Sequence, residues 1–528
     1  LNSNDATVSN CRFRQCDASG QGGGIFVGES PVQIVDCEFT NNTAGDDGGA
    51  IAKFPEQGQL TIEGCVFTEN TAADSGGALY NNAPLDVQSS EFDSNQSNYG
   101  GAFRSNTSSV GFSNCQFTGN VAHVRGGAIH ANATAEITID SSSFTGNSSG
   151  DDGGAIDIFS STGSLIATGC TFTNNASGGD GGAACFSAAG ATILLEESSF
   201  TGNDAVEGGA IFTGEASEIT ISDCTFVSNN ATLNPNAGGG GAIYLTNDSN
   251  ASIQQTTFES NAASYGGAII SSRGFPVLID CTFTSNTADL DGGAVYGNVQ
   301  SLSNLQGCDF ETNQAGRDGG AVHVIAGSDL ELSGCTLVSN SAGEEGGGIY
   351  ASNSDLLVTD STFSGNQATF SGGLGVRSSQ NVTVRDSIFD GNIALGSSGA
   401  AEMWQVTTAS FTGCTVVNNM AQGTNGGWGI GSGLRFNNIA TSALVDSCVI
   451  QDNVALGDGV HETLGGGILV DSGASGVAID LVDSTLCGNS PDQISGSFTD
   501  LGGNCISEIC DSDDDGIADC LDPCPNWP

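Results

Sequence analysis

The chain has 528 residues, of which 60 are acidic and only 10 are basic, and its formal net charge at pH 7 is −50. Proteins that bind nucleic acids or anionic membrane surfaces need clustered positive charge, so this balance excludes both as partners. The sequence holds no run of 18 apolar residues, and we therefore expect no insertion into a membrane.

A short pattern recurs along almost the whole chain at an interval of about 27 residues. Each unit starts with Cys, Ser or Thr, continues with x-Phe-x-x-Asn and a small loop, and ends with Gly-Gly-Ala and an aliphatic residue. Cys65, Phe67, Asn70 and Gly76-Gly77 belong to one such unit. The asparagine recurs most regularly, at Asn42, Asn70, Asn95, Asn120, Asn147, Asn175, Asn203, Asn229, Asn261, Asn286, Asn313, Asn340, Asn366, Asn392 and Asn419, with Asn453 and Asn489 as the last members. A repeat of this length indicates a solenoid.

The apolar residues inside a unit alternate with polar ones, which is the periodicity of strands. Leu60 and Ile62 form one such pair, and Cys65 and Phe67 the next. Strands this short cannot form an isolated sheet, but they can coil so that each strand pairs in parallel with its counterpart one turn later. The sequence therefore predicts an all-β fold, a right-handed single-stranded parallel β-helix of about 17–18 turns over residues 1–490.

Stacked turns place equivalent residues in columns. We expect the phenylalanines to form an aromatic column in the core, and the asparagines to bond to one another at a turn where they can adopt left-handed backbone angles. Cysteines stack as well, with Cys11, Cys37 and Cys65 in successive turns. Parallel side chains hold the Cβ atoms of stacked cysteines too far apart for a disulfide, so we expect buried free thiols there.

The residue after Gly-Gly-Ala-Ile/Leu/Val varies widely, which suits an outward-facing position. We interpret its aromatic and histidine members, together with two tryptophans from the irregular turns between Asn392 and Asn489, as a possible binding face for a glycan or a protein. The alternative is a set of ordinary exposed strand residues. The members are Tyr80, His130, Phe212, Tyr244, Tyr296, His323, Tyr350, Trp404 and Trp428.

Acidic residues cluster just before the double glycine, for example at Asp46-Asp47, Asp74, Asp180 and Asp318. Stacked turns would align these carboxylates along one edge, where they repel one another. Two interpretations stay open: a row of weak calcium sites, or a solvated acidic edge.

Many β-helices act on polysaccharides, and such chemistry needs a local cluster of acid–base groups. Paired acids occur throughout this chain, so none stands out, and the best cluster is His123, Arg125 and His130. Ordinary surface residues of a variable strand are the better explanation of this cluster, and we expect that the protein is not an enzyme.

The C-terminal residues differ in kind from the repeat. We expect a cap or linker over 491–509, and the better disulfide candidates are Cys487, Cys505, Cys510, Cys520 and Cys524. Carboxylates at alternate positions, with Gly516 at a sharp turn, are typical of a calcium loop. Residues 510–528 are similar to a thrombospondin type 3 repeat, which implies a Ca²⁺-binding tail stapled by disulfides. The expected ligands are Asp511, Asp513, Asp515, the carbonyl of Ile517, Asp519 and Asp522.

Taken together over residues 10–490, the Phe-x-x-Asn and Gly-Gly-Ala-Ile/Leu/Val motifs resemble the repeats of polymorphic outer-membrane proteins and their bacterial β-helix relatives. In that family the repeats form a surface-exposed passenger implicated in adhesion. The resemblance and the composition lead us to expect a secreted or cell-surface protein, structural or adhesive in role, an adhesin or stalk stabilised by Ca²⁺.

Two alternative functions remain. The first is a subunit of an extracellular filament, because unpaired strand edges at the ends of a β-helix allow head-to-tail stacking of copies. The second is a polysaccharide-active β-helix enzyme. The expected partner is therefore the protein itself, or a glycan or protein of a cell surface.

Overall fold

The structure, a computed structural model, describes residues 6–510 except 55–56, 107–108, 133–135, 160–162, 187–189, 215, 232–237, 247, 302, 424–429, 458–462, 472 and 474–475. Every regular element in this part of the chain is a β-strand. The chain divides into two compact units, one of Leu1–Ser264 with Ala268–Phe275 and the other of Tyr265–Gly267 with Pro276–Pro528. Each coil of a solenoid contacts only its neighbouring coils.

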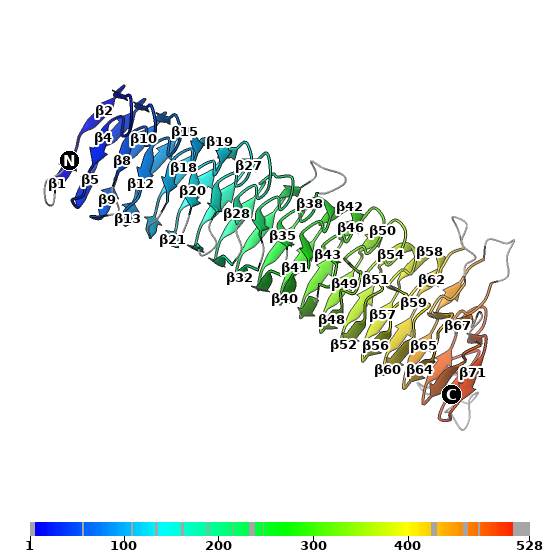
Figure 1. The fold of residues 1–528 in the computed structure, drawn as a ribbon. Helices are drawn as coiled ribbons and strands as arrows, with labels where there is room; N and C mark the ends of the chain where they lie inside the picture. Colours follow the sequence, from blue (N-terminus) through cyan, green and yellow to red (C-terminus); the bar gives the residue numbers. More distant parts are fainter. Residues whose placement is uncertain are drawn as a thin grey trace, which may run out of the picture. The chain divides into compact units, whose positions relative to one another are not determined.

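In the first unit, one coil contains four short strands separated by turns. They are β9 (Leu60–Glu63), β10 (Val66–Thr68), β11 (Thr71–Ala72) and β12 (Leu79–Asn81). Each strand pairs in parallel, without slippage, with its counterparts one coil before and one coil after; β9, for example, pairs with β5 (Val32–Val35) and β13 (Leu85–Gln88). Figure 1 shows these parallel strands of successive coils lying side by side.

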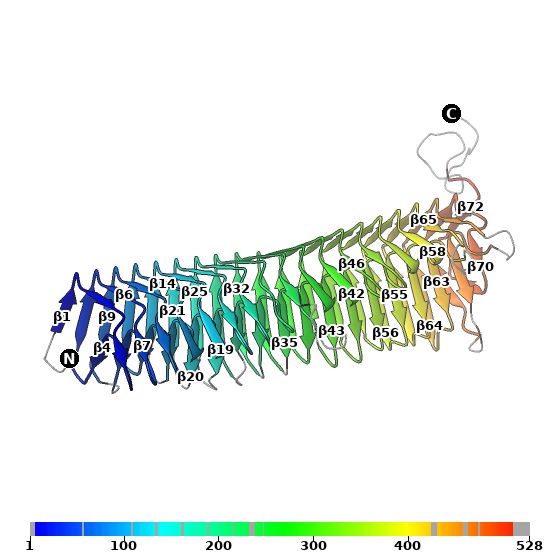
Figure 2. The ribbon, with the colours of Figure 1, turned by 90° about the horizontal axis from the view of Figure 1, so that it is seen from above.

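The second unit repeats this plan. One of its coils consists of β48 (Leu330–Ser333), β49 (Thr336–Val338), β50 (Ser341–Ala342) and β51 (Ile349–Ser352). Strand β48 pairs in parallel with β44 (Ser303–Gln306) and β52 (Leu356–Thr359), and Figure 2 shows the same stacking from a second direction. The predicted all-β parallel β-helix is thus confirmed, and the two units together hold about 17 turns.

The predicted asparagine ladder lies inside the coil. Asn70 is fully buried; its Nδ2 donates to Asn95 Oδ1 at 3.0 Å and to the carbonyl of Phe39 at 3.0 Å, and its backbone N–H also donates to Asn95 Oδ1. The left-handed residue at this turn is the one before the ladder, Glu69 with φ 54°, so our assignment of left-handed angles to the asparagine itself was wrong. The asparagine is held instead by its hydrogen bonds to the coils on either side.

The predicted phenylalanine column is confirmed. The rings of Phe39, Phe67 and Phe92 stack at centroid distances of 4.9 and 4.7 Å with interplanar angles of 6° and 7°, and all three are fully buried. Burial of each ring contributes about 1.5–3 kcal/mol. The ladder and the column together fix the register of each coil on the next.

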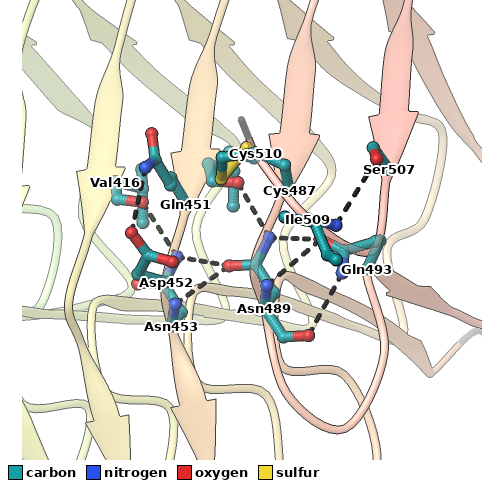
Figure 3. The surroundings of a disulfide bond; sticks show 11 residues. Val416, Gln451, Asp452, Asn453, Cys487, Asn489, Gln493, Ser507, Ile509 and Cys510 are labelled. Carbon is teal, nitrogen blue, oxygen red and sulfur yellow. Dashed lines mark hydrogen bonds between the residues drawn. A yellow bond between two sulfur atoms is a disulfide. The ribbon is translucent and has the colours of Figure 1, made fainter. Parts of the chain in front are cut away.

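Cysteines stacked in the coil were predicted to be free thiols, and C-terminal cysteines to form disulfides; the structure shows an example of each. Cys37 and Cys65 are buried free thiols, and the backbone N–H of Cys37 donates to Sγ of Cys65 at 3.4 Å. Near the C-terminus, Cys487 and Cys510 form a disulfide with a Cα–Cα distance of 4.9 Å (Figure 3). Beside it the asparagine ladder ends at Asn489, whose Nδ2 donates to Oε1 of Gln493 at 2.7 Å.

The coil continues past the predicted end of the β-helix at residue 490. Strands β70 (Ile494–Ser495), β71 (Phe498–Asp500) and β72 (Cys505–Ser507) pair in parallel with the preceding coil. The cap or linker predicted over 491–509 thus contains three strands that continue the parallel pairing of the solenoid beyond residue 490. The described part of the chain holds no helix suited to crossing a membrane.

Candidate functional site

The residues that follow Gly-Gly-Ala-Ile/Leu/Val form what we call the outer column. In the first unit Tyr80, Arg104, His130 and Asp157 are register partners in successive coils, on β12, β16 (Phe103–Ser105), β20 (Ile129–Asn132) and β24 (Ile156–Phe159). In the second unit Tyr296 of β43 (Val295–Asn298), His323 of β47 (Val322–Ile325) and Tyr350 of β51 follow one another in the same way.

Most of the predicted binding face is covered. Tyr80, His130, Tyr296, His323 and Tyr350 expose only 3–6% of their surface, so our expectation of an outward-facing, exposed column was wrong for them. Phe212 and Tyr244 are half-buried. The expectation failed because the glycine corner folds over the outer column.

The glycine corner lies directly against these side chains. A Cβ placed on Gly126 would lie 2.9 Å from the Cβ of His130, and one on Gly319 would lie 2.6 Å from the Cβ of His323. Both glycines also have positive φ, +67° and +66°. Only glycine fits such a corner without displacing the outer column.

The residues immediately before each double glycine form a second row, which we call the cover column. They include Asp47, Ser75, Tyr99, Arg125, Asp152, Asp180 and Glu207 in the first unit, and Tyr265, Asp291, Asp318 and Glu345 in the second. They contact the outer column: the ring of Tyr99 lies 5.4 Å from that of His130, and the ring of Tyr265 lies 5.2 Å from that of Tyr296.

Carboxylates of the cover column are crowded. Burial, with the nearby charges of Glu207 and Asp152, raises the pKa of Asp180 to about 7, and burial with Asp46 and Asp74 raises the pKa of Asp47 to about 6. In the second unit burial raises the pKa of Glu345 to about 7. The repulsion expected from stacked acids is thus present, whereas a row of calcium ions along this edge stays a prediction.

One surface pocket of the first unit gathers several basic and aromatic groups. It has a volume of about 310 Å³ and is lined by Tyr99, Arg104, Arg125, His130, Asn132 and Phe159. The guanidinium of Arg104 lies 4.8 Å from the centre of the Tyr99 ring, and that of Arg125 lies 4.8 Å from the centre of the Phe159 ring. Phe159 is 46% exposed, so its ring offers an apolar surface at the mouth of the pocket.

Acidic neighbours neutralise the positive charges of this pocket. Nη2 of Arg125 lies 2.9 Å from Asp152 and 3.3 Å from Asp151, and Nη1 of Arg104 lies 3.8 Å from Asp74. His130 contacts Asp157, with Nδ1 2.7 Å from Oδ2, and both side chains are buried. A histidine oriented by a buried carboxylate is an arrangement suited to acid–base chemistry.

The sequence cluster of His123, Arg125 and His130 is only partly brought together. Arg125 and His130 line the pocket, whereas His123 is exposed and its Nε2 lies 2.9 Å from Nε2 of Gln96. The sequence reasoning missed Tyr99, Asn132, Phe159 and the acidic partner Asp157. The contact of Asp157 with His130 could have been predicted from the sequence, because Asp157 occupies the same position of the repeat one coil later.

A second cluster lies in the other unit, where Asp291, Asp318 and His323 offer donor atoms that all lie within 4.8 Å of one another. Nδ1 of His323 lies 3.8 Å from Oδ2 of Asp291. Burial lowers the pKa of His323 to about 4, so its ring is neutral at pH 7. Arg317 pairs with Asp291, with Nε donating to Oδ1 at 2.8 Å.

The remaining predicted site residues are separate from both clusters. Trp404 is half-buried on β59 (Ala401–Trp404), with the guanidinium of Arg377 4.1 Å from its ring centre. Trp428 lies outside the described residues. So do the expected calcium ligands Asp511, Asp513, Asp515, Ile517, Asp519 and Asp522, and the calcium loop stays a prediction.

Comparison with known families identifies the class of this fold. The profile of the right-handed β-helix region matches residues 1–172, 56–226, 209–368, 280–439 and 318–504, so the chain belongs to this family. The predicted right-handed β-helix repeat protein is thereby confirmed.

A search of the curated proteins gave no significant match. Among solved structures, a mutant of an alginate lyase of the PL6 family is similar at 10% identity, over 95% of this chain and 97% of that chain, with a TM-score of 0.20.

Proposed function

We propose that the protein is an extracellular β-helix of structural and adhesive role that binds a glycan at the pocket of Tyr99, Arg104, Arg125, His130, Asn132 and Phe159. The observation that carries the proposal is the meeting of an exposed aromatic ring, an amide and two guanidinium groups around one pocket of about 310 Å³. Ligand pockets combine apolar and aromatic walls with a few convergent polar groups, and this pocket has that composition.

The charges around the pocket favour a neutral glycan. Its arginines are already paired with Asp74, Asp151 and Asp152, and the chain carries a net charge of −50, which repels polyanions. An extracellular location agrees with the Cys487–Cys510 disulfide, because disulfides persist in oxidising compartments. A calcium-binding tail and head-to-tail assembly remain further predictions of the sequence.

A glycan array probed with the full chain, followed by calorimetry on the best ligand, tests the proposal. Phe159→Ala should weaken binding by about tenfold, since removal of an aromatic ring on which a ligand stacks costs on the order of 1–3 kcal/mol in the case of nucleobases. The matched control is Phe26→Ala, because Phe26 is also 46% exposed and lies away from the pocket, on β4 (Ile25–Val27). Absence of any bound glycan, or equal losses in both variants, would contradict the proposal.

A second candidate is a polysaccharide-active enzyme, favoured by the contact of His130 with Asp157 beside Tyr99. Polysaccharides retained by the protein should then be cleaved, with new reducing ends as the readout. His130→Gln should abolish cleavage, while His123→Gln, which changes an exposed histidine outside the pocket, should not. Binding without cleavage by the unaltered chain would reject this candidate and leave the adhesive role.

A further inference from the structure

We propose that Asp291, Asp318 and His323 of the second unit bind one divalent transition-metal ion, for which Zn²⁺ is the best fit. Asp291 ends β42 (Thr287–Asp291), Asp318 belongs to the cover column one coil later, and His323 lies on β47 in the outer column. The site is independent of the glycan pocket, which lies in the first unit, and it would tie two successive coils together.

The spacing of the donor atoms suits a small cation. Ligand atoms about 2.1 Å from Zn²⁺ lie about 3.4 Å apart in a tetrahedral site. Nδ1 of His323 and Oδ2 of Asp291 are 3.8 Å apart, and all three donors lie within 4.8 Å of one another. Small side-chain adjustments would therefore complete the site. An imidazole with two carboxylates favours zinc and similar transition metals over calcium, which takes oxygen ligands alone.

His323 supplies an independent observation that points to a ligand. It is only 3% exposed, and neither ring nitrogen has a hydrogen-bond partner among the described residues. Buried polar atoms are nearly always paired, so two unpaired nitrogens in one ring call for an explanation. His130, at the same repeat position of the first unit, has the partner that His323 lacks, Asp157 at 2.7 Å.

Neighbouring rings and backbone N–H groups fix the orientation of the His323, Asp291 and Asp318 side chains. The rings of Tyr296 and Tyr350 lie 5.4 and 5.1 Å from that of His323. Backbone N–H groups orient the carboxylates: that of Asp318 donates to Oδ1 of Asp291 at 3.3 Å, and that of Glu345 donates to Oδ1 of Asp318 at 3.0 Å. Such outer hydrogen bonds are what fixes metal ligands in known sites.

Arg317 holds the place of the cation in this structure. Its guanidinium bonds to Asp291, and its Nε lies 3.7 Å from Oδ2 of Asp318. The Arg317 side chain is 43% exposed, so it can turn toward solvent while the metal ion replaces its charge. Arg317 is therefore a competitor of the metal and not a ligand.

The test is calorimetric titration of Zn²⁺ into the full chain, freed of metal with a chelator and with its Cys487–Cys510 disulfide intact. We expect one equivalent to bind tightly, and His323→Gln to weaken that binding by at least about 100-fold, since even outer-shell losses cost 10–100-fold. The matched control, His130→Gln, should change it by less than about threefold. Removal of the competitor in Arg317→Gln should strengthen binding by about three- to tenfold.

Circular dichroism of each variant shows whether the fold is retained. Asp318→Asn removes the charge of a second proposed ligand with almost no change in side-chain size, and it should also weaken Zn²⁺ binding. The proposal is overturned if the unaltered chain binds no equivalent of Zn²⁺, if His323→Gln and His130→Gln lose affinity equally, or if equimolar Ca²⁺ displaces the Zn²⁺. Tighter binding by Arg317→Gln is a result that a purely structural role of the cluster would not produce.

Discussion

The asparagine ladder inside the coil and the outer column on its surface come from the same repeat, yet only the ladder is uniform. Asn70 and Asn95 make the same set of bonds in successive coils and are fully buried. In the outer column, by contrast, Arg104 is followed by His130 and then by Asp157. The difference teaches that the ladder fixes the backbone, which leaves the outer positions free to carry different chemistry.

The largest effect should follow from removing one ladder residue. In Asn229→Leu, the backbone N–H of Asn203 and the carbonyl of Phe200 lose their partners, at 3.1 and 2.9 Å. Each unpaired buried group costs about 1–3 kcal/mol, so we expect a loss of about 2–6 kcal/mol in unfolding free energy, measured by urea denaturation. The adjacent Asn230→Leu loses only a half-buried bond to Asp204 and should cost about 1 kcal/mol. If Asn229→Leu and Asn230→Leu cost the same, the ladder would stabilise the fold no more than an ordinary side-chain hydrogen bond does.

A smaller effect should come from the corner that covers the outer column. Gly126→Ala combines a positive φ of +67° with a Cβ 2.2 Å from the carbonyl oxygen of Ile129 and 2.9 Å from the Cβ of His130, and we expect a cost of about 3 kcal/mol. Gly146→Ala is the control, because φ is +63° there but a Cβ would meet nothing within 4 Å, and it should cost about 1 kcal/mol. Thermal unfolding of both variants measures the difference. If the two variants are equally stable, the positive φ alone explains the need for glycine, and the close contacts with Ile129 and His130 do not.

The smallest effect concerns the acidic cover column. Because burial raises the pKa of Asp180 to about 7, the folded chain binds a proton more readily than the unfolded one. Stability should therefore fall as the pH rises from about 4 to about 7, and stay low above it. Asp180→Asn should stabilise the chain at pH 8 by on the order of 1 kcal/mol, after allowance for solvent screening, and have little effect at pH 4. Melting temperatures at both values check this, and an equal effect at both would contradict it.

The repeat predicted the interior almost completely, because interior positions are fixed by contacts with identical residues one coil away. Phe67 stacks on Phe39, and Asn70 bonds to Asn95, as the interval of the motif requires. The same interval places Asp157 beside His130. The sequence did not reveal that the glycine corner buries His130, since burial there depends on the path of a loop whose length and composition vary.

The prediction also stopped where the motif fades. In the last coil Ile509 stands where the repeat has its asparagine, yet strands β71 and β72 pair with the preceding coil as earlier strands do. Parallel pairing of the backbone needs no particular side chain once a coil is available as a template. The calcium loop predicted at residues 511–522 lies outside the described residues, so it remains an expectation of the sequence alone.

The account rests on the outer column being a covered layer in which side chains meet, and the ionisation of His323 tests this most directly. The chain has only four histidines, so ¹⁵N-labelled histidine gives a resolvable set of ring signals by NMR. In metal-free protein the His323 ring should stay neutral from pH 8 down to pH 5, because burial lowers its pKa to about 4. A His323 ring that titrates near the ordinary value of about 6.5 would show that the covering side chains do not keep the ring neutral, and it would contradict the account.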